Sequence, residues 1–153
     1  MSTVFVGYES RLRPFASTII ARAQRTARTR RVLQRRPTDA VMIDSVSVAR
    51  AVAYVRDHLS EVFGVEAVLA ASGVPRRSLE LAFKAALGCT PYQFITRARL
   101  VRAKELLASE RPQKLSEIAR SCGFADLRRF RLVFRRELGM SPAEHREALR
   151  LVH

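Results

Sequence analysis

LELAFKAALGCTP, at Leu79–Pro91, returns 51 positions later as FRLVFRRELGMSP, at Phe130–Pro142. Five positions are identical in the two copies: Leu81/Leu132, Phe83/Phe134, Leu87/Leu138, Gly88/Gly139 and Pro91/Pro142. Apolar residues recur every four positions, which places one per turn on a single helix face. The glycine then ends the helix, because it tolerates positive φ, and the Thr-Pro or Ser-Pro that follows begins another helix. The chain is therefore predicted to use one supersecondary unit twice.

A short helix is predicted before each copy, ending in LAASG at Leu69–Gly73 and in ARSCG at Ala119–Gly123. Two helices joined by a tight glycine turn form a helix-turn-helix motif. The second helix of each motif carries basic side chains away from its apolar stripe. A cationic helix in this arrangement can enter the major groove of DNA.

The composition favours an all-α protein that binds a polyanion. The 153 residues include 28 Lys and Arg against 14 Asp and Glu, which gives a net charge of +14. No apolar run approaches the roughly 18 residues of a membrane span. Cys89 and Cys122 have no Cys or His at metal-ligand spacing, and we expect buried thiols in a reducing cytoplasm. No catalytic or phosphate-binding arrangement is visible, so we expect no enzyme activity, cofactor, metal, small-molecule site or membrane partner.

We predict about seven helices in two helix-turn-helix subdomains, joined by a long linker helix and preceded by a basic N-terminal extension. The extension is expected at residues 1–43 and the DNA-binding domain at 44–153, with Asp44 or Ser45 as the N-cap of its first helix. That first helix is expected to brace the first motif. The two motifs and the linker helix are expected at about 65–88, 115–139 and 91–109.

Residues Ser45–Arg146 resemble the DNA-binding domain of the AraC/XylS family, the arabinose-operon regulators, and within it the xylose-operon type. The most specific parts of the resemblance are EIARSCGF at Glu117–Phe124 and FRRELGMSP at Phe134–Pro142. The resemblance implies a bacterial transcription regulator of the cytoplasm and nucleoid. Such a protein binds double-stranded DNA sequence-specifically, with its two motifs in successive major grooves, and has RNA polymerase as a further partner. The sequence does not distinguish an activator from a repressor.

The family's base-contacting positions, carried over by position, fall on the second helix of each motif. They are Arg76, Arg77, Glu80, Leu81, Arg128, Arg129, Arg131 and Leu132. Arginine can bind guanine O6 and N7 together, and glutamate can accept a hydrogen bond from cytosine N4. The expected phosphate contacts, which set the register of the protein on DNA, are Lys84, Arg135 and Arg136.

Leu81 and Leu132 depart from the family pattern, because many members carry Arg at these positions. A leucine can touch a thymine methyl group but cannot bind guanine by hydrogen bonds. Alternatively, each leucine can lean onto a neighbouring helix. The sequence leaves both interpretations open.

Met1–Asp39 carries nine Arg against Glu9 and Asp39, a net charge of +7. It is interpreted as a poorly ordered basic tail, a transit peptide, or the remnant of a sensor linker. The last interpretation rests on Val32–Ile43, which resembles the strand and linker that follow the sensor in xylose-operon regulators. Two other functions remain open: a non-specific nucleic-acid-binding helical protein, and a non-functional fragment of a sugar-responsive regulator.

Overall fold

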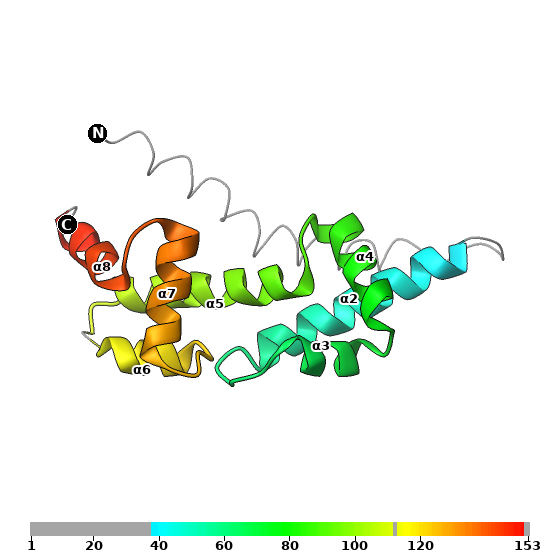
Figure 1. The fold of residues 1–153 in the computed structure, drawn as a ribbon, viewed down its shortest axis with the longest axis horizontal. Helices are drawn as coiled ribbons and strands as arrows, with labels where there is room; N and C mark the ends of the chain where they lie inside the picture. The colour runs from blue at the N-terminus through cyan, green and yellow to red at the C-terminus, as the bar shows by residue number, and fades with distance from the viewer. Residues whose placement is uncertain (1–37, 112, 152–153) are drawn as a thin grey trace. The chain divides into compact units, whose positions relative to one another are not determined.

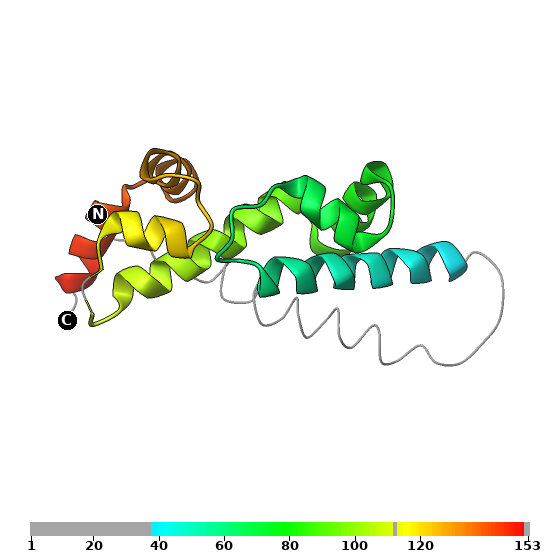
Figure 2. The ribbon, with the colours of Figure 1, turned by 90° about the horizontal axis from the view of Figure 1, so that it is seen from below.

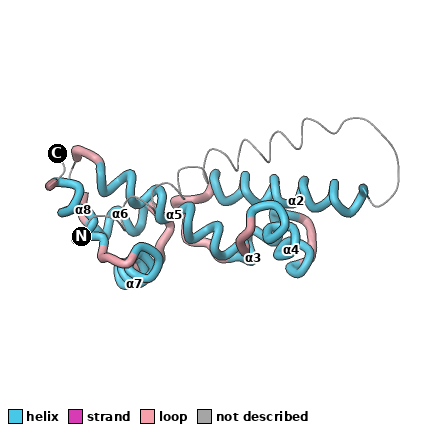
Figure 3. Tube along the Cα trace, turned by 90° about the horizontal axis from the view of Figure 1, so that it is seen from above, coloured by secondary structure: helices cyan, strands magenta, loops and turns pink. Residues whose placement is uncertain are grey.

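The computed structural model describes residues 38–111 and 113–151, with side chains described from Ser45 onward. This part of the chain forms helices joined by loops and turns, without a strand (Figures 1 and 3). The described helices are α2 (Thr38–Asp57), α3 (Val65–Ser72), α4 (Arg76–Leu87), α5 (Pro91–Ala108), α6 (Leu115–Ser121), α7 (Leu127–Leu138) and α8 (Pro142–Arg150). The prediction of an all-α fold with two helix-turn-helix motifs and about seven helices is confirmed for the described residues.

The chain divides into two compact units, and the first contains α2, α3 and α4. α2 packs against both helices of the first motif, as Figure 2 shows. The hydrophobic residues that these three helices bury are Val48, Ala51, Val52, Val55, Val68, Leu79, Ala82 and Phe83. The prediction that this helix braces the first helix-turn-helix motif is confirmed.

α2 begins at Thr38, earlier than the predicted N-cap at Asp44 or Ser45. The stretch between these positions contains neither Gly nor Pro, so nothing in it stops the helix from extending backwards. Residues 38–43, which form part of the stretch that resembles the strand and linker of xylose-operon regulators, are helical. The rest of the predicted extension lies outside the described residues, and the domain boundary at residue 44 stays a prediction.

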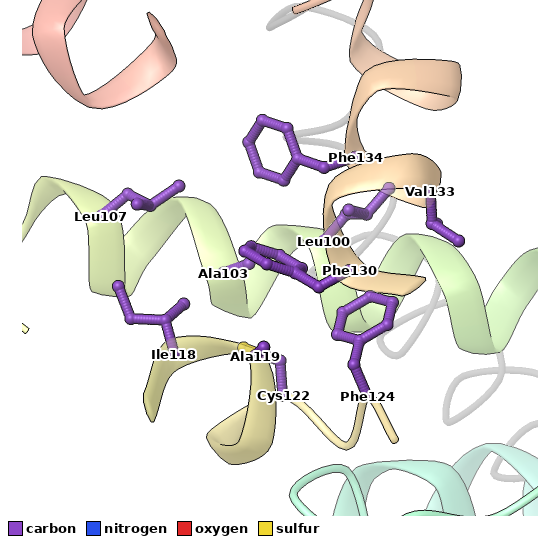
Figure 4. Close-up of a cluster of buried hydrophobic side chains, with 10 residues drawn as sticks. All are labelled: Leu100, Ala103, Leu107, Ile118, Ala119, Cys122, Phe124, Phe130, Val133 and Phe134. Carbon is purple, nitrogen blue, oxygen red and sulfur yellow. The ribbon is translucent and has the colours of Figure 1, made fainter. Parts of the chain in front are cut away.

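The second unit contains most of α5 together with α6, α7 and α8. Figure 4 shows its core, in which side chains of α5, α6, α7 and the α6–α7 turn point toward one another: Leu100, Ala103, Leu107, Ile118, Ala119, Cys122, Phe124, Phe130, Val133 and Phe134. Aromatic rings continue through this core. Phe130 lies with its ring centroid 5.1 Å from that of Phe124 and 5.5 Å from that of Phe134, and the Phe134 ring meets the buried His145 ring edge-on at 5.6 Å.

The segment His58–Gly64 belongs to the second unit, although in sequence it connects α2 to α3. Arg99 of α5 holds it there. Its Nη2 donates hydrogen bonds to the carbonyl oxygens of Glu61 and Phe63, both at 3.1 Å. The same guanidinium lies 4.6 Å from the centre of the Phe63 ring and 5.9 Å from that of Phe124. Hydrogen bonds and cation–π contacts therefore fasten this segment to the α6–α7 turn.

The helix boundaries otherwise agree with the predicted ranges to within two residues. α5 ends at Ala108, one residue before the expected end of the linker helix, and α6 begins at Leu115, where the second motif was expected to begin. Pro75 lies one position before α4, with φ of −59° and ψ of 152°. Among the described residues no helix is long and apolar enough to cross a membrane.

Candidate nucleic-acid interface

One face of α4 is buried in the core of the first unit, and the opposite face is polar and exposed. Leu79, Ala82 and Phe83 are buried, while the positions between them are exposed. The helix ends at Gly88, which has φ of 68° and donates its backbone N–H to the Lys84 carbonyl. The exposed face carries Arg76, Arg77, Glu80, Leu81 and Lys84.

Part of the charge on the α4 face is already neutralised within the protein. Arg76 forms an ion pair with Glu66 of α3, and its Nη1 lies 3.7 Å from Glu80 Oε1 one turn further along α4. All three side chains are about half exposed or more, so these pairs are weak and can rearrange when a ligand arrives. Arg77 and Lys84 form no ion pair with an acidic side chain of the described residues.

α7 is built on the same plan, with a stronger N-terminus. The Asp126 side chain caps the helix by accepting a hydrogen bond from the Arg129 backbone N–H at 2.6 Å. Phe130, Val133 and Phe134 are buried, and Gly139 ends the helix with φ of 75°. The exposed face carries Arg128, Arg129, Arg131, Leu132, Arg135 and Arg136.

Leu81 and Leu132 are both largely exposed to solvent. Leu81 is 63% exposed and Leu132 is 62% exposed. Neither side chain is buried by a neighbouring helix, and contact of either leucine with a thymine methyl group stays a prediction. Two large apolar side chains therefore face solvent at matched positions of α4 and α7, each surrounded by basic residues.

All eleven predicted site residues are exposed and lie on α4 or α7. The structure brings the first five together on α4 and the other six together on α7. Their contacts with DNA bases or phosphates stay predictions. Within each set the spacing keeps the side chains on the face opposite the buried stripe, which is the arrangement a groove-binding helix requires.

Arg99 is the residue whose role the sequence did not reveal. It belongs to a run of basic residues on α5 that resembles an ordinary solvated face. Its partners, Glu61 and Phe63, are 38 and 36 positions away, so no local spacing indicates them. Arg99 contacts both His58–Gly64 and the α6–α7 turn, and it thereby helps to position the turn that precedes α7.

The two cysteines are buried, as expected, and do not contribute to the polar faces of α4 and α7. Burial raises the pKa of the Cys122 thiol to about 11, with the nearby Arg102 acting weakly in the opposite direction. The thiol is therefore protonated at neutral pH and is a poor nucleophile. Cys122 acts as a small apolar side chain in the core of the second unit.

A helix-turn-helix domain model matches residues 68–148, which is more than half of the chain. The transcriptional activator RhaS of Escherichia fergusonii is 38% identical over 96 residues, covering 63% of this chain and 34% of RhaS. The xylose operon regulatory protein of Escherichia coli K12 is 34% identical over 117 residues, covering 76% of this chain and 30% of that protein. The chain thus spans about a third of the length of these curated relatives.

Solved structures of similar proteins share the fold. The DNA-binding domain of AdpA, a global transcriptional factor determined in complex with a target DNA, superimposes with a TM-score of 0.65 at 34% identity. That match covers 70% of this chain and 96% of the AdpA domain. The xylose-binding transcription activator xylR matches with a TM-score of 0.56 at 33% identity, covering 67% of this chain and 27% of xylR.

Proposed function

Because the chain belongs to the AraC/XylS family of helix-turn-helix transcription regulators, we propose that it binds double-stranded DNA sequence-specifically and thereby regulates transcription. The observation that carries the proposal is the pair of matched helices, α4 and α7. Each has a buried stripe, a left-handed glycine at its end and an exposed face of basic side chains around one leucine. A polyanion with periodic grooves fits two such faces.

The chemistry of the two faces suggests a division of roles. Arg76, Arg77, Arg128, Arg129 and Arg131 can each bind guanine through two donors, and Glu80 can accept from cytosine N4. Leu81 and Leu132 offer an apolar surface to thymine methyl groups. Lys84, Arg135 and Arg136 lie toward the C-terminal ends of the helices, where contacts to phosphate would set the register.

The relatives support the proposal without extending it to the whole protein. AdpA provides a domain of this fold bound to its target DNA, and nearly all of that domain is covered by this chain. RhaS is a transcriptional activator, and on that likeness we propose activation as the mode of regulation, with RNA polymerase as a partner in the cytoplasm.

The proposal is tested by binding measurements on duplexes selected from a random pool. We expect the selected duplex to be bound at least about 10³-fold more tightly than unrelated duplex. Arg77→Ala is expected to cost about 1–3 kcal/mol and to relax the preference at one or two base pairs. Lys84→Ala, the matched control on the same helix face, should weaken binding to all sequences alike.

A non-specific nucleic-acid-binding protein is the outcome that would replace this proposal. It would bind selected and unrelated duplexes equally, with affinity that falls steeply as salt rises. About five to eight phosphate contacts predict a slope of log K against log[salt] of roughly −0.9 per contact for either protein. The salt slope alone therefore tests for a polyanion ligand, and only the competition between duplexes tests for specificity.

A further inference from the structure

α4 and α7 are in the same structural register, so their exposed positions can be compared one by one. At an offset of 51 residues, the buried residues of α4 correspond to buried residues of α7: Leu79/Phe130, Ala82/Val133 and Phe83/Phe134. The terminal glycines correspond as well, and each donates its backbone N–H to a matched carbonyl, of Lys84 or of Arg135. The almost equal exposure of Leu81 and Leu132 shows that the outward faces also correspond.

Three exposed pairs keep their chemistry across this comparison, and one pair reverses its charge. Arg76 and Arg129 have no basic counterpart, because the matched residues are Leu127 and Ser78. The pairs with the same side-chain chemistry in both helices are Arg77/Arg128, Leu81/Leu132 and Lys84/Arg135. The reversed pair is Glu80 on α4 and Arg131 on α7, where an acceptor-only carboxylate faces solvent in one helix and a donor-only guanidinium in the other. Both residues stand three positions after the matched arginine and one position before the matched leucine.

The surroundings of the reversed pair reinforce its difference. Glu80 has Arg76 one turn before it and Lys84 one turn after it, and it forms an ion pair with Arg76. Arg131 instead has Arg128 three positions before it and Arg135 four positions after it, and like charges at these spacings repel one another. Arg131 is thus expected to gain from an electronegative guanine edge, whereas Glu80 repels that edge and needs a donor.

We infer that the two half-sites on the DNA share the base pairs read by Arg77/Arg128 and Leu81/Leu132 and differ at the pair read by Glu80 and Arg131. This inference rests on the proposed function. Glutamate accepts from the N4 amino group of cytosine, and arginine donates to O6 and N7 of guanine. Because the two side chains leave matched positions on the same helix face, they reach the same strand of their half-sites. The first half-site carries cytosine where the second carries guanine.

The test is selection from a random duplex pool with the wild-type chain and with Glu80→Arg. We expect two blocks in the wild-type site that share the base pairs read by Arg77/Arg128 and Leu81/Leu132 and differ at the pair read by Glu80 and Arg131. Glu80→Arg should change the preferred base from cytosine to guanine in the α4 block, by about tenfold to a hundredfold in relative affinity, and leave the α7 block unchanged. Arg131→Glu should make the reciprocal change, from guanine to cytosine in the α7 block.

A matched control separates base reading from a simple gain of positive charge. Ala85 is exposed on α4 and corresponds to Arg136 of α7. Ala85→Arg adds the same charge to the same helix, so it should tighten binding to all duplexes without changing any preferred base. Because all three substitutions lie on exposed positions, unfolding curves close to that of the wild type are expected and should accompany the selection.

The possible outcomes distinguish the inference from the function on which it rests. If the wild-type chain selects no sequence, the proposed function fails. If it selects a site in which both blocks carry the same base at this pair, the proposed function stands and the inference is overturned. The inference is equally overturned if Glu80→Arg shifts preference no more than Ala85→Arg does.

Discussion

The glycines in the two helix-turn-helix turns have nearly the same backbone conformation and very different surroundings. Gly73 has φ of 74° and is exposed, and a Cβ added there would come no closer than 3.7 Å to any atom outside its chain neighbours, the Nη1 of Arg50. Gly123 has φ of 70° and is buried. A Cβ at Gly123 would lie 2.4 Å from the carbonyl oxygen of Glu61 and 2.7 Å from that of Leu59.

A repeated sequence can therefore repeat the local backbone conformation without repeating the tertiary contacts that surround it. Both turns require a positive φ, and this requirement follows from the motif itself. Only the second turn must also leave space for another part of the chain, because His58–Gly64 packs against it. Hydrogen bonds from Arg99 to the carbonyl oxygens of Glu61 and Phe63 keep this segment in place. Substitutions at the two turns should therefore differ in their effect on stability.

Gly123→Ala should be the most destabilising of these changes. The left-handed conformation costs a non-glycine residue about 1–2 kcal/mol, and overpacking against fixed backbone adds about 1–3 kcal/mol. Gly73→Ala carries only the first cost and is the matched control. Denaturant unfolding of both variants measures the difference. Equal losses of stability would mean that His58–Gly64 does not press on the α6–α7 turn.

Arg99→Ala should destabilise the second unit by about 1–3 kcal/mol, because it removes two hydrogen bonds to backbone carbonyls and the contacts with the Phe63 and Phe124 rings. Arg102→Ala is the control, since Arg102 is an exposed arginine on the same helix. Amide hydrogen exchange should report faster opening of residues 58–64 and of the α6–α7 turn in Arg99→Ala alone. If the hydrogen-exchange rates of these residues are unchanged, Arg99 does not position the segment or the turn.

The N-termini of α4 and α7 differ as well, and Asp126→Ala tests how much the side-chain cap of α7 contributes to stability. Asp126 caps α7 through its side chain, whereas Pro75 before α4 offers no side-chain cap. Loss of the cap should lower the free energy of unfolding by about 1 kcal/mol, and Asp126→Asn should retain most of it. Thermal unfolding checks both variants. If Asp126→Asn is as unstable as Asp126→Ala, the hydrogen bond to Arg129 is not what stabilises α7.

The smallest expected effect is a pH dependence confined to the second unit. The Glu144 carboxylate accepts a hydrogen bond from the Ser141 backbone N–H at 2.6 Å, and this bond, together with the Ser141 side chain, holds the pKa of the carboxyl below the ordinary value of 4.5. A lowered pKa in the folded state stabilises the protein above pH 4.5, and this stabilisation is lost as the pH falls through the folded-state pKa. Unfolding of Glu144→Gln should therefore depend less on pH in this acidic range than unfolding of the wild type.

The first copy of the sequence repeat supplies the control for this pH effect, because the position that matches Glu144 is Gln93. A glutamine does not titrate, so the start of α5 contributes no pH dependence of this kind. Gln93→Glu should introduce one if the Thr90-Pro91 start forms the same reciprocal cap. A wild-type stability that falls in parallel with that of Glu144→Gln between pH 6 and 3 would contradict the assignment to Glu144.

Local sequence patterns were sufficient to predict α4 and α7 and the exposure of the eleven predicted residues on their polar faces. The stripe of Leu79, Ala82 and Phe83 identifies the buried side of α4, and the positions between must then be exposed. Helix ends were predictable where a glycine or a Ser-Pro pair marks them. The start of α2 was predicted too late, because Asp44 and Ser45 are good N-caps by composition and yet lie inside a helix that continues back to Thr38. A capping residue permits a helix start and does not require one.

Residue spacing along the chain was enough to predict an all-α protein and two matched helices with one buried and one polar face, and the composition was enough to predict the charge that favours a polyanion. These features depend on residues within one or two turns of each other, whose spacing is written in the chain. Three further features became visible only in the folded protein. Leu81 and Leu132 are largely exposed, the backbone carbonyls of Leu59 and Glu61 pack closely against Gly123, and Arg99 binds backbone carbonyls instead of facing solvent alone. Each of these facts depends on which distant segments pack together, and the free energy of that packing belongs to the whole fold rather than to any stretch of sequence.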